Sequence, residues 1–255
     1  MFTVFVVGPA GSGKSTLVAA LYNWLIEHDM DTIIVNLDPA AEWLPYTPDV
    51  DVREYVTARK LMEEYNLGPN AAIIAAADYI ALNAEEIQRE INDLRPGYVL
   101  VDTPGQIELF VFRAVGPHIV NTLSAERAAV LFLFDVVFAS RPASFVSAML
   151  LSLSCYYRLQ RPQLNVLTKI DLVERKVVDE ICEWAENVDE LYSRIELEHS
   201  GFEREISRDV CSLLSKVWSM TRVLPVSAKT GEGIDSLYAV LQQIYVGGED
   251  YVTLP

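Results

Sequence analysis

The sequence contains little cysteine and little positive charge. Its three cysteines, Cys155, Cys182 and Cys211, are an odd number at wide spacing and include no CxxC pair, which excludes a dense disulfide framework and predicts a reducing compartment such as the cytoplasm. Lysine and arginine number 20 against 36 aspartate and glutamate, for a formal charge of −16. So acidic a chain lacks the basic surface that tracks nucleic-acid phosphates, and we expect no nucleic-acid partner.

Long apolar runs are also missing. The most apolar stretch, residues 128–139, is interrupted by Asp135 and followed by Arg141 and Pro142, and it is too short to cross a bilayer. The apolar run at the N-terminus is short and no basic segment precedes it, so we expect neither a signal peptide nor a membrane partner. No internal repeat or low-complexity segment divides the chain, which predicts one domain over 1–255 with ample apolar content for a core.

The chain does have a phosphate-binding motif near its start. Gly8, four intervening residues, Gly13, Lys14 and Ser15 match the P-loop spacing, and they lie between a strand-like apolar run and a helical pattern, as this motif requires. The glycines let the backbone curl its N–H groups around a polyphosphate at the positive end of a helix dipole. Lys14 can reach the β- and γ-phosphates, and the Ser15 hydroxyl can complete the shell of a bridging Mg²⁺. The predicted nucleotide cradle consists of Gly11, Ser12, Gly13, Lys14, Ser15 and Thr16.

Apolar runs and amphipathic segments alternate along the rest of the chain, which predicts an α/β fold. We expect a helical insertion over about 40–95, with one helix over 51–67 and another that begins after Asn83 as its N-cap. A second helical insertion is expected over about 174–220, before a last helix that begins near Ile234. The six expected strands are residues 2–7, 32–37, 98–101, 127–135, 163–167 and 222–226.

Two helical segments have apolar or charged faces with alternative explanations. The helix expected over 142–158 is apolar on more than one face, so it packs either in the core or against a partner. Between Glu174 and Glu205 acids outnumber bases eleven to four, which is typical of a solvated helix face and is also compatible with a partner surface. A stripe expected to face the core is made of Ile206, Val210, Leu213 and Val217.

Acidic residues stand at the ends of two expected strands. Asp38 follows the strand over 32–37, where it could face Mg²⁺ or the attacking water, although an Asp-Pro pair is also typical of a turn. Asp102 ends the strand that begins at Tyr98, the position from which a P-loop enzyme holds Mg²⁺ opposite its P-loop hydroxyl. We therefore predict Ser15 and Asp102 as the metal-side pair.

The segment after Asp102 can contact the terminal phosphate. The peptide N–H of Gly105 could sense a γ-phosphate, and Gln106 has both a donor and an acceptor with which to orient a water. Capping of the following helix is the alternative role for Gln106.

A third motif predicts the base that the site selects. Thr168, Lys169 and Asp171 follow the strand over 163–167. A carboxylate at Asp171 can accept hydrogen bonds from guanine N1–H and N2, which adenine lacks, while the Lys169 stem packs over the base. Because the wrong base would leave a buried carboxylate unpaired, this pair predicts GTP. The backbone of a later segment could contact guanine O6, and that segment is Ser227, Ala228 and Lys229.

With these segments in place, the chain resembles the GPN-loop GTPases along nearly its whole length. The family takes its name from Gly68-Pro69-Asn70, which on local chemistry alone is a turn. The matching segments are GPAGSGKST (8–16), LDPA (37–40), GPN (68–70), DTPGQIE (102–108), TKID (168–171) and SAK (227–229). The resemblance implies a P-loop NTPase fold with a mostly parallel sheet flanked by helices, Mg²⁺-dependent GTP hydrolysis, and a homodimer whose GPN loop projects toward the partner's γ-phosphate.

Two positions depart from neighbouring families. Pro9 stands where many related dimeric ATPases carry a lysine, so the resemblance assigns the trans-acting role to the GPN loop. Thr168 stands where many GTPases have asparagine, a position at which GPN-loop proteins vary. Because the chain ends soon after its last helix, it looks more like an archaeal member than a eukaryotic one with a C-terminal extension. A protein client is possible, but the sequence does not identify it.

We therefore predict a homodimeric, nucleotide-switched GTPase that binds GTP and GDP with Mg²⁺. Its predicted catalytic residues are Lys14, Asp38, Asn70 and Gln106. One alternative is a nucleotide-gated assembly module with slow hydrolysis, in which GTP sets a shape. Another is a metal-enzyme maturation GTPase, which the scattered histidines and unclustered cysteines disfavour. The three histidines are His28, His118 and His199.

Overall fold

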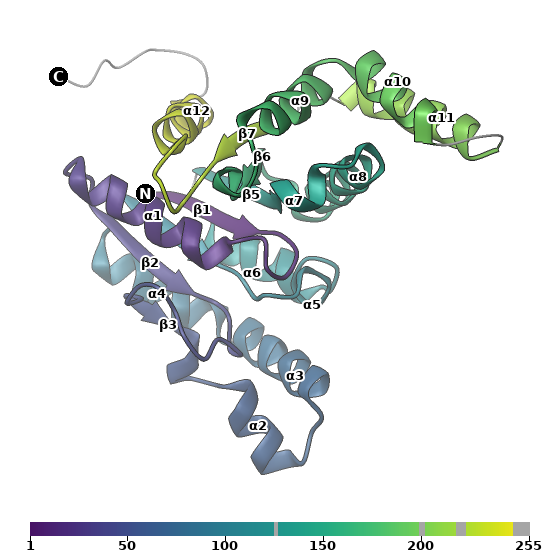
Figure 1. Cartoon of the computed structure of the whole chain (residues 1–255). Coiled ribbons are helices and arrows are strands. Elements are labelled where there is room, and N and C mark those ends of the chain that lie inside the picture. The colour runs from purple at the N-terminus through teal and green to yellow at the C-terminus, as the bar shows by residue number, and fades with distance from the viewer. Residues whose placement is uncertain (125–126, 199–201, 218–222, 247–255) are drawn as a thin grey trace.

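The computed structural model describes residues 1–124, 127–198, 202–217 and 223–246. Figure 1 shows a sheet flanked on both faces by helices. Its seven strands follow the order β3-β2-β4-β1-β5-β6-β7, and every neighbouring pair is parallel. The strands are β1 (Phe2–Val7), β2 (Thr32–Asn36), β3 (Val50–Asp51), β4 (Tyr98–Asp102), β5 (Arg127–Asp135), β6 (Gln163–Thr168) and β7 (Val223–Val226). The α/β fold with a parallel sheet is confirmed.

Helices cover both faces of the sheet, which explains why its strands are continuous apolar runs. Along β1, Val4 and Val6 point into one core cluster and Phe5 and Val7 into the other, because successive side chains of a strand alternate between faces. The first cluster lies under α1 (Lys14–Glu27) and α12 (Ile234–Val246). The longer helices on the opposite face are α3 (Pro69–Leu82), α4 (Ala84–Leu94), α6 (Val115–Leu123), α8 (Pro142–Leu159) and α9 (Arg175–Glu186).

The remaining elements are short or lie away from the sheet. These remaining elements are η1 (Val52–Glu54), α2 (Ala58–Tyr65), α5 (Ile107–Phe110), α7 (Val136–Ala139), η2 (Ile170–Leu172), α10 (Val188–Glu198) and α11 (Phe202–Val217). In Figure 1, α10 and α11 extend outward beyond α9 on the β6 and β7 side.

The strand order changes direction at β1, which lies between β4 and β5. In an open parallel sheet, such a switch point opens a crevice at the carboxyl ends of the strands. The loops that follow β1, β2, β4, β6 and β7 all leave at this edge, so segments far apart in the sequence meet there.

The helix expected over 51–67 is wrong in its first part, and only Ala58–Tyr65 is helical as expected. Val50 instead pairs with Val35 as a short edge strand, the turn η1 follows, and helix begins only at Ala58. The Asp51 side chain accepts a hydrogen bond from the Arg53 N–H and so caps η1. Pairing with β2 and local capping therefore overrode the helical pattern, and the sheet has seven strands instead of six.

The GPN tripeptide is not the isolated turn that its local chemistry indicates. Gly68 is the N-cap of α3, and Pro69 is its first residue, a position that suits proline because its missing N–H would have no helical partner. The alanine-rich sequence that follows extends this helix to Leu82, and its residues Ala72 and Ala76 are buried. Gly68-Pro69-Asn70 is thus the start of a helix that the sequence analysis did not predict.

Other helices differ from expectation in their packing. Asn83 precedes α4 as expected, but its side chain donates to the Tyr79 carbonyl of α3 instead of capping α4. In α11 the expected stripe is wrong in part, because Ile206 and Leu213 are both 47% exposed while Cys211 and Leu214 are buried. The burial pattern is shifted by one residue along that helix.

The helix α8 packs mainly in the core, which was one of the two alternatives predicted for it. Phe145, Met149 and Cys155 are buried, whereas Tyr157 is 66% exposed. Within the described residues, no helix is long and apolar enough to cross a membrane. The predictions for Arg222 as a strand start, for residues 218–220 of the second insertion, for the Val217 side chain and for His199 fall outside what the structure describes.

Candidate nucleotide and metal site

The loop after β1 has the backbone of a phosphate cradle. A Cβ at Gly8 would lie 2.5 Å from the Leu133 carbonyl oxygen, so only glycine fits against β5 there. Gly13 has φ 92° and is the N-cap of α1, which begins at Lys14. The N–H groups at the start of α1 have no partner within the helix and therefore suit an anion.

Lys14 is held by three carbonyl oxygens. Its Nζ donates to the oxygens of Gly8 and Pro9, both at 3.0 Å, and of Gly105 at 3.2 Å. Burial lowers the pKa of Lys14, and the negative charges of Asp102 and Asp38 oppose that shift. The ammonium group thus joins the P-loop to the segment after β4.

Asp102 is a buried carboxylate with an unused acceptor. It is 1% exposed, its Oδ2 accepts from the Tyr46 hydroxyl at 2.6 Å, and its Oδ1 has no hydrogen-bond partner in the described part of the chain. Burial raises the pKa of Asp102, while the Ser15 and Tyr46 hydroxyls and the Lys14 charge lower it. A buried carboxylate oxygen without a donor, near the Ser15 hydroxyl, fits a hard cation such as Mg²⁺.

Asp38 contacts the segment that the sequence predicted to sense a γ-phosphate. Its Oδ2 accepts from the Gly105 N–H at 3.0 Å, and its Oδ1 accepts from the Ala40 N–H at 2.9 Å. One oxygen of Asp38 thus forms the local turn, and the other connects the loop after β2 to the segment after β4; its role toward Mg²⁺ or water stays a prediction.

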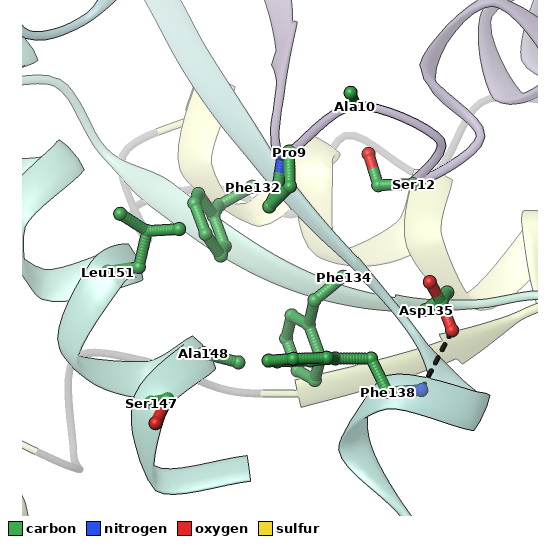
Figure 2. Close-up of a pocket in the computed structure, with 10 residues that line it drawn as sticks. All are labelled: Pro9, Ala10, Ser12, Phe132, Phe134, Asp135, Phe138, Ser147, Ala148 and Leu151. Atoms are coloured by element: carbon green, nitrogen blue, oxygen red, sulfur yellow. Dashed lines mark hydrogen bonds between the residues drawn. The ribbon is translucent and has the colours of Figure 1, made fainter. Parts of the chain in front are cut away.

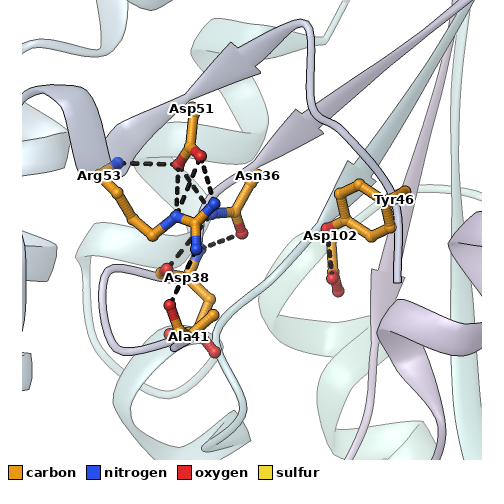
Figure 3. Close-up of polar contacts among 7 residues, drawn as sticks. All are labelled: Asn36, Asp38, Ala41, Tyr46, Asp51, Arg53 and Asp102. Atoms are coloured by element: carbon orange, nitrogen blue, oxygen red, sulfur yellow. Dashed lines mark hydrogen bonds and ion pairs between the residues drawn. The ribbon is translucent and has the colours of Figure 1, made fainter. Parts of the chain in front are cut away.

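A polar network beside Asp38 was missed in the sequence. Figure 3 shows Asp51 between Asn36 and Arg53. Asn36 Nδ2 donates to Asp51 Oδ1 at 2.9 Å, and Arg53 donates to both Asp51 oxygens and to the Ala41 carbonyl at 3.0 Å. Asn36 also accepts from the Asp38 N–H. Burial raises the pKa of Asp51, but hydrogen bonds from Arg53 and Asn36 outweigh this and hold it below its usual value.

No motif marks this network, because it depends on an edge strand that the sequence analysis replaced with a helix. Tyr46, which bonds Asp102, lies in a stretch that the sequence left irregular. Its isolated position among prolines offered no signal for a role.

Gln106 is exposed at the N-cap of α5, and its side chain makes no capping hydrogen bond there. The Gln106 side chain therefore does not cap α5, which was the alternative role predicted for it.

Asn70 is exposed in the first turn of α3, and among the described residues its side chain makes no hydrogen bond. An open cavity of about 680 Å³ joins Pro69 to the Asp38 loop at Pro39 and Ala40. Pro69 of the GPN tripeptide thus shares a cavity with the loop that carries Asp38.

The segments predicted for the guanine base do come together. A cavity of about 240 Å³ lies between α1 and the loops after β6 and β7. Asp171 Oδ1 accepts from the Ser227 hydroxyl at 2.6 Å, and Lys169 Nζ donates to the Gly11 carbonyl at 2.5 Å. The residues that line this cavity are Gly13, Thr16, Leu17, Thr168, Lys169, Asp171, Leu172, Ala228 and Lys229.

Thr168 braces the P-loop without an amide. Its hydroxyl lies 2.7 Å from the Ser12 carbonyl and 3.2 Å from the Phe134 carbonyl. The threonine hydroxyl therefore ties the P-loop to β5 and β6.

A further cavity, which the sequence did not predict, backs the P-loop. Figure 2 shows Phe132, Phe134, Phe138 and Leu151 around it, with Pro9 of the P-loop on one side. It has a volume of about 390 Å³, and its other lining residues are Ala10, Ser12, Asp135, Ser147 and Ala148. The Ser12 hydroxyl is buried and has no hydrogen-bond partner in the described residues.

No group of three or more histidine, cysteine or acidic side chains in the described residues could hold a metal ion. The three cysteines are free thiols, and burial raises the pKa of Cys155 to about 12.

Comparisons with known proteins cover nearly the whole chain. A family model described as a conserved hypothetical ATP binding protein matches residues 6–246. A GPN-loop GTPase of Pyrococcus abyssi is 33% identical over 247 residues, which is 96% of this chain and 97% of that protein. The crystal structure of a Pyrococcus abyssi GTPase in its apo form superposes with a TM-score of 0.86 at 33% identity, and the match covers 96% of this chain and 97% of that one.

Eukaryotic relatives give the same family. GPN-loop GTPase 3 of Danio rerio is 33% identical over 95% of this chain and 86% of its own length. GPN-loop GTPase 1 of Dictyostelium discoideum is 31% identical over 97% of this chain, but the match spans only 62% of that relative's length. From the family model and from relatives matched over most of their length, we conclude that the chain belongs to the GPN-loop GTPase family.

Proposed function

We propose that the chain binds GTP in the cradle after β1 and hydrolyses it to GDP and phosphate with Mg²⁺, as a homodimer that switches with its nucleotide. Membership of a family of GTPases supports the activity. The observation that carries the proposal is the convergence of Lys14, Asp38, Asp102 and Gly105 at one edge of the sheet, although they come from three segments far apart in the sequence.

The Ser15 hydroxyl would hold Mg²⁺ directly, and Asp102 would hold it from behind through water. When bound, the ion would supply positive charge that neutralises the charge developing on the phosphates. The orphaned Asp102 Oδ1 supports this assignment, because a buried carboxylate oxygen without a donor is costly unless something binds it.

Lys14, Asp38 and Gln106 would position the phosphate and the attacking water. Lys14 would exchange its carbonyl partners for phosphate oxygens. The Gly105 N–H, which Asp38 now occupies at 3.0 Å, would turn to the γ-phosphate. Asp38 would then be free to accept a proton from water, with the exposed Gln106 amide orienting that water.

Guanine would lie in the cavity beside Asp171. Its carboxylate accepts from the Ser227 hydroxyl through Oδ1, so it retains acceptor capacity for N1–H and N2 of the base. Lys169 would cover the ring, and the backbone at Ser227, Ala228 and Lys229 would contact O6.

Asn70 would act on the nucleotide from, or next to, the partner subunit. Its exposure and its lack of a hydrogen bond within the described chain leave the side chain available. We also propose that residues 1–255 act as one domain. The free thiols support a reducing, cytoplasmic setting, and a protein client would recognise the nucleotide-dependent shape.

The first test measures GTP and ATP hydrolysis with Mg²⁺ for the wild type, Asn70→Ala and Asn92→Ala, with light scattering to record the oligomeric state. Asn92 is the matched control, because it is an exposed asparagine on α4 whose side chain accepts a hydrogen bond from Gln88. We expect GTP turnover to fall at least tenfold in Asn70→Ala while the dimer persists. Full activity in Asn70→Ala would remove the GPN loop from the proposal. Equal hydrolysis of ATP and GTP by the wild type would remove the guanine specificity.

One observation favours a second candidate, the nucleotide-gated module with slow hydrolysis. Lys14 and the Gly105 N–H both have internal partners, so a bound nucleotide would have to displace contacts that join the P-loop, the Asp38 loop and the segment after β4. A turnover below about one per hour together with a large change in scattering profile between GDP and a GTP analogue would favour this candidate.

A further inference from the structure

Tyr46 contacts the metal-side carboxylate although no motif includes it. It lies in the loop of residues 37–49, between β2 and β3, and its hydroxyl donates to Asp102 Oδ2 at 2.6 Å. In Figure 3 the phenol ring stands beside Asp102, apart from the Arg53 network. The ring packs against the core cluster under α1, so the hydroxyl is delivered by a side chain that packing fixes in place.

The contact leaves the Asp102 carboxylate half satisfied. An ionised carboxylate has about four acceptor sites on its two oxygens, and here Oδ2 has the phenol while the buried Oδ1 has no hydrogen-bond partner in the described residues. With Oδ2 held, the carboxylate cannot rotate without breaking its bond to Tyr46. The group is therefore oriented with one oxygen in reserve for a ligand.

We propose that Tyr46 is a positioning residue that orients Asp102 toward Mg²⁺ and its water ligands; this inference rests on the proposed function. Tyr46 touches neither nucleotide nor ion in this role and acts only through Asp102. Groups that hydrogen-bond a metal-side carboxylate fix its orientation, and their loss commonly weakens metal binding by roughly 10- to 100-fold.

The same loop also reaches the phosphate side of the site. Asp38 near its start binds the Gly105 N–H, and Tyr46 near its end binds Asp102. The loop thus forms a hydrogen bond to each end of the segment from Asp102 to Gly105. A change at Tyr46 that disordered the loop would weaken nucleotide and metal binding together, whereas loss of orientation alone would weaken only metal binding.

The test compares Tyr46→Phe with the wild type and with Tyr55→Phe. The matched control removes the same kind of bond, since the Tyr55 hydroxyl donates to the Glu90 carboxylate on the exposed face of the insertion. Electron paramagnetic resonance measures Mn²⁺ binding to each protein with GDP bound, and fluorescence measures GDP affinity in EDTA. GTP turnover is then followed across a Mg²⁺ titration.

For Tyr46→Phe we expect the Mn²⁺ dissociation constant to rise about tenfold or more, the metal-free GDP affinity to stay within twofold, and turnover to recover at saturating Mg²⁺. An unchanged Mn²⁺ affinity would overturn the proposal, as would a tighter one, which would make the phenol an inhibitor of metal binding. A parallel loss of metal-free GDP affinity would make its role structural. Failure of the wild type itself to bind Mn²⁺ with GDP would overturn the proposed function, a result distinguishable from failure of the Tyr46 inference alone.

Discussion

At the scale of single residues, the two groups that we propose to bind phosphate already have hydrogen-bond partners within the protein. Lys14 Nζ has three carbonyl partners, and the Gly105 N–H has the Asp38 carboxylate. A phosphate would therefore exchange hydrogen bonds rather than add them, so the net gain per bond is modest. Charge repulsion has a larger effect on phosphate binding than the exchange of hydrogen bonds, because the Asp38 carboxylate and a γ-phosphate would both be negatively charged beside the Gly105 N–H.

Asp171 allows a sharp test of base selection. Replacing it by alanine removes a charged acceptor for guanine N1–H and N2, which is worth ~1.5–3 kcal/mol, or roughly 10- to 100-fold in affinity. We expect the GTP dissociation constant of Asp171→Ala to rise by that factor while ATP affinity is unchanged. Titration with fluorescent nucleotides measures both.

Asp179→Ala serves as the control, since Asp179 is an exposed carboxylate that pairs with Arg175 on α9. Equal GTP affinity in Asp171→Ala and the wild type would place the base elsewhere.

At the scale of elements, the loop between β2 and β3 is fixed at three points. Asp38 binds the segment after β4, Arg53 binds the Ala41 carbonyl, and Tyr46 binds the end of β4. Because these anchors come from three elements, the loop that carries Asp38 is ordered by the sheet and not by its own sequence. Trp43 lies in the same loop, and 77% of its surface is exposed.

The anchor at Arg53 makes stability depend on pH. The pKa of Asp51 is lowered in the folded protein, so its contribution is present above the unfolded pKa of about 4 and is lost as the pH falls through the folded value. We expect Arg53→Met to reduce the free energy of unfolding at pH 7 by about 1–3 kcal/mol. The difference from the wild type should shrink below pH 4, which urea denaturation at a series of pH values measures.

Arg59→Met is the matched control, because Arg59 forms an exposed pair with Glu63 on α2 and such pairs contribute little. A wild-type advantage that is constant from pH 7 to pH 3 would show that Asp51 is not the group that Arg53 stabilises.

At the scale of the whole molecule, one bound nucleotide would join loops from both halves of the sheet. The P-loop follows β1, Asp102 ends β4, and the cavity that we propose for guanine lies between α1 and the loops after β6 and β7. A ligand that binds only the folded state stabilises it by mass action. GDP with Mg²⁺ should therefore stabilise the entire chain, and not one loop.

We expect GDP with Mg²⁺, at about 100 times its dissociation constant, to raise the free energy of unfolding by about 2.7 kcal/mol. EDTA should remove part of this gain, because Ser15 and Asp102 would lose the ion that joins them to the phosphates. Urea denaturation with and without ligand measures both effects. An equal gain from ADP would contradict the assignment of the base site.

Contiguous motifs and apolar runs were sufficient to predict much of this protein. The P-loop, the Asp102 segment and the Lys169–Asp171 segment each lie within a few residues, and their strands are apolar because both faces of the sheet are covered. Parallel topology then brings their ends to one edge. Local sequence was therefore enough to predict that these segments meet at one edge of the sheet, and the roles of their residues toward nucleotide and metal stay predictions.

Only the tertiary structure decided what surrounds these motifs. Val50 pairs with β2 although its neighbours have a helical pattern, and this pairing places Asp51 beside Asn36. The Tyr46 hydroxyl reaches Asp102 across 56 positions of sequence, and no local pattern encodes a contact of that length. The physical reason is the same in each case: pairing at a sheet edge and satisfaction of buried polar groups depend on the neighbours that the fold supplies.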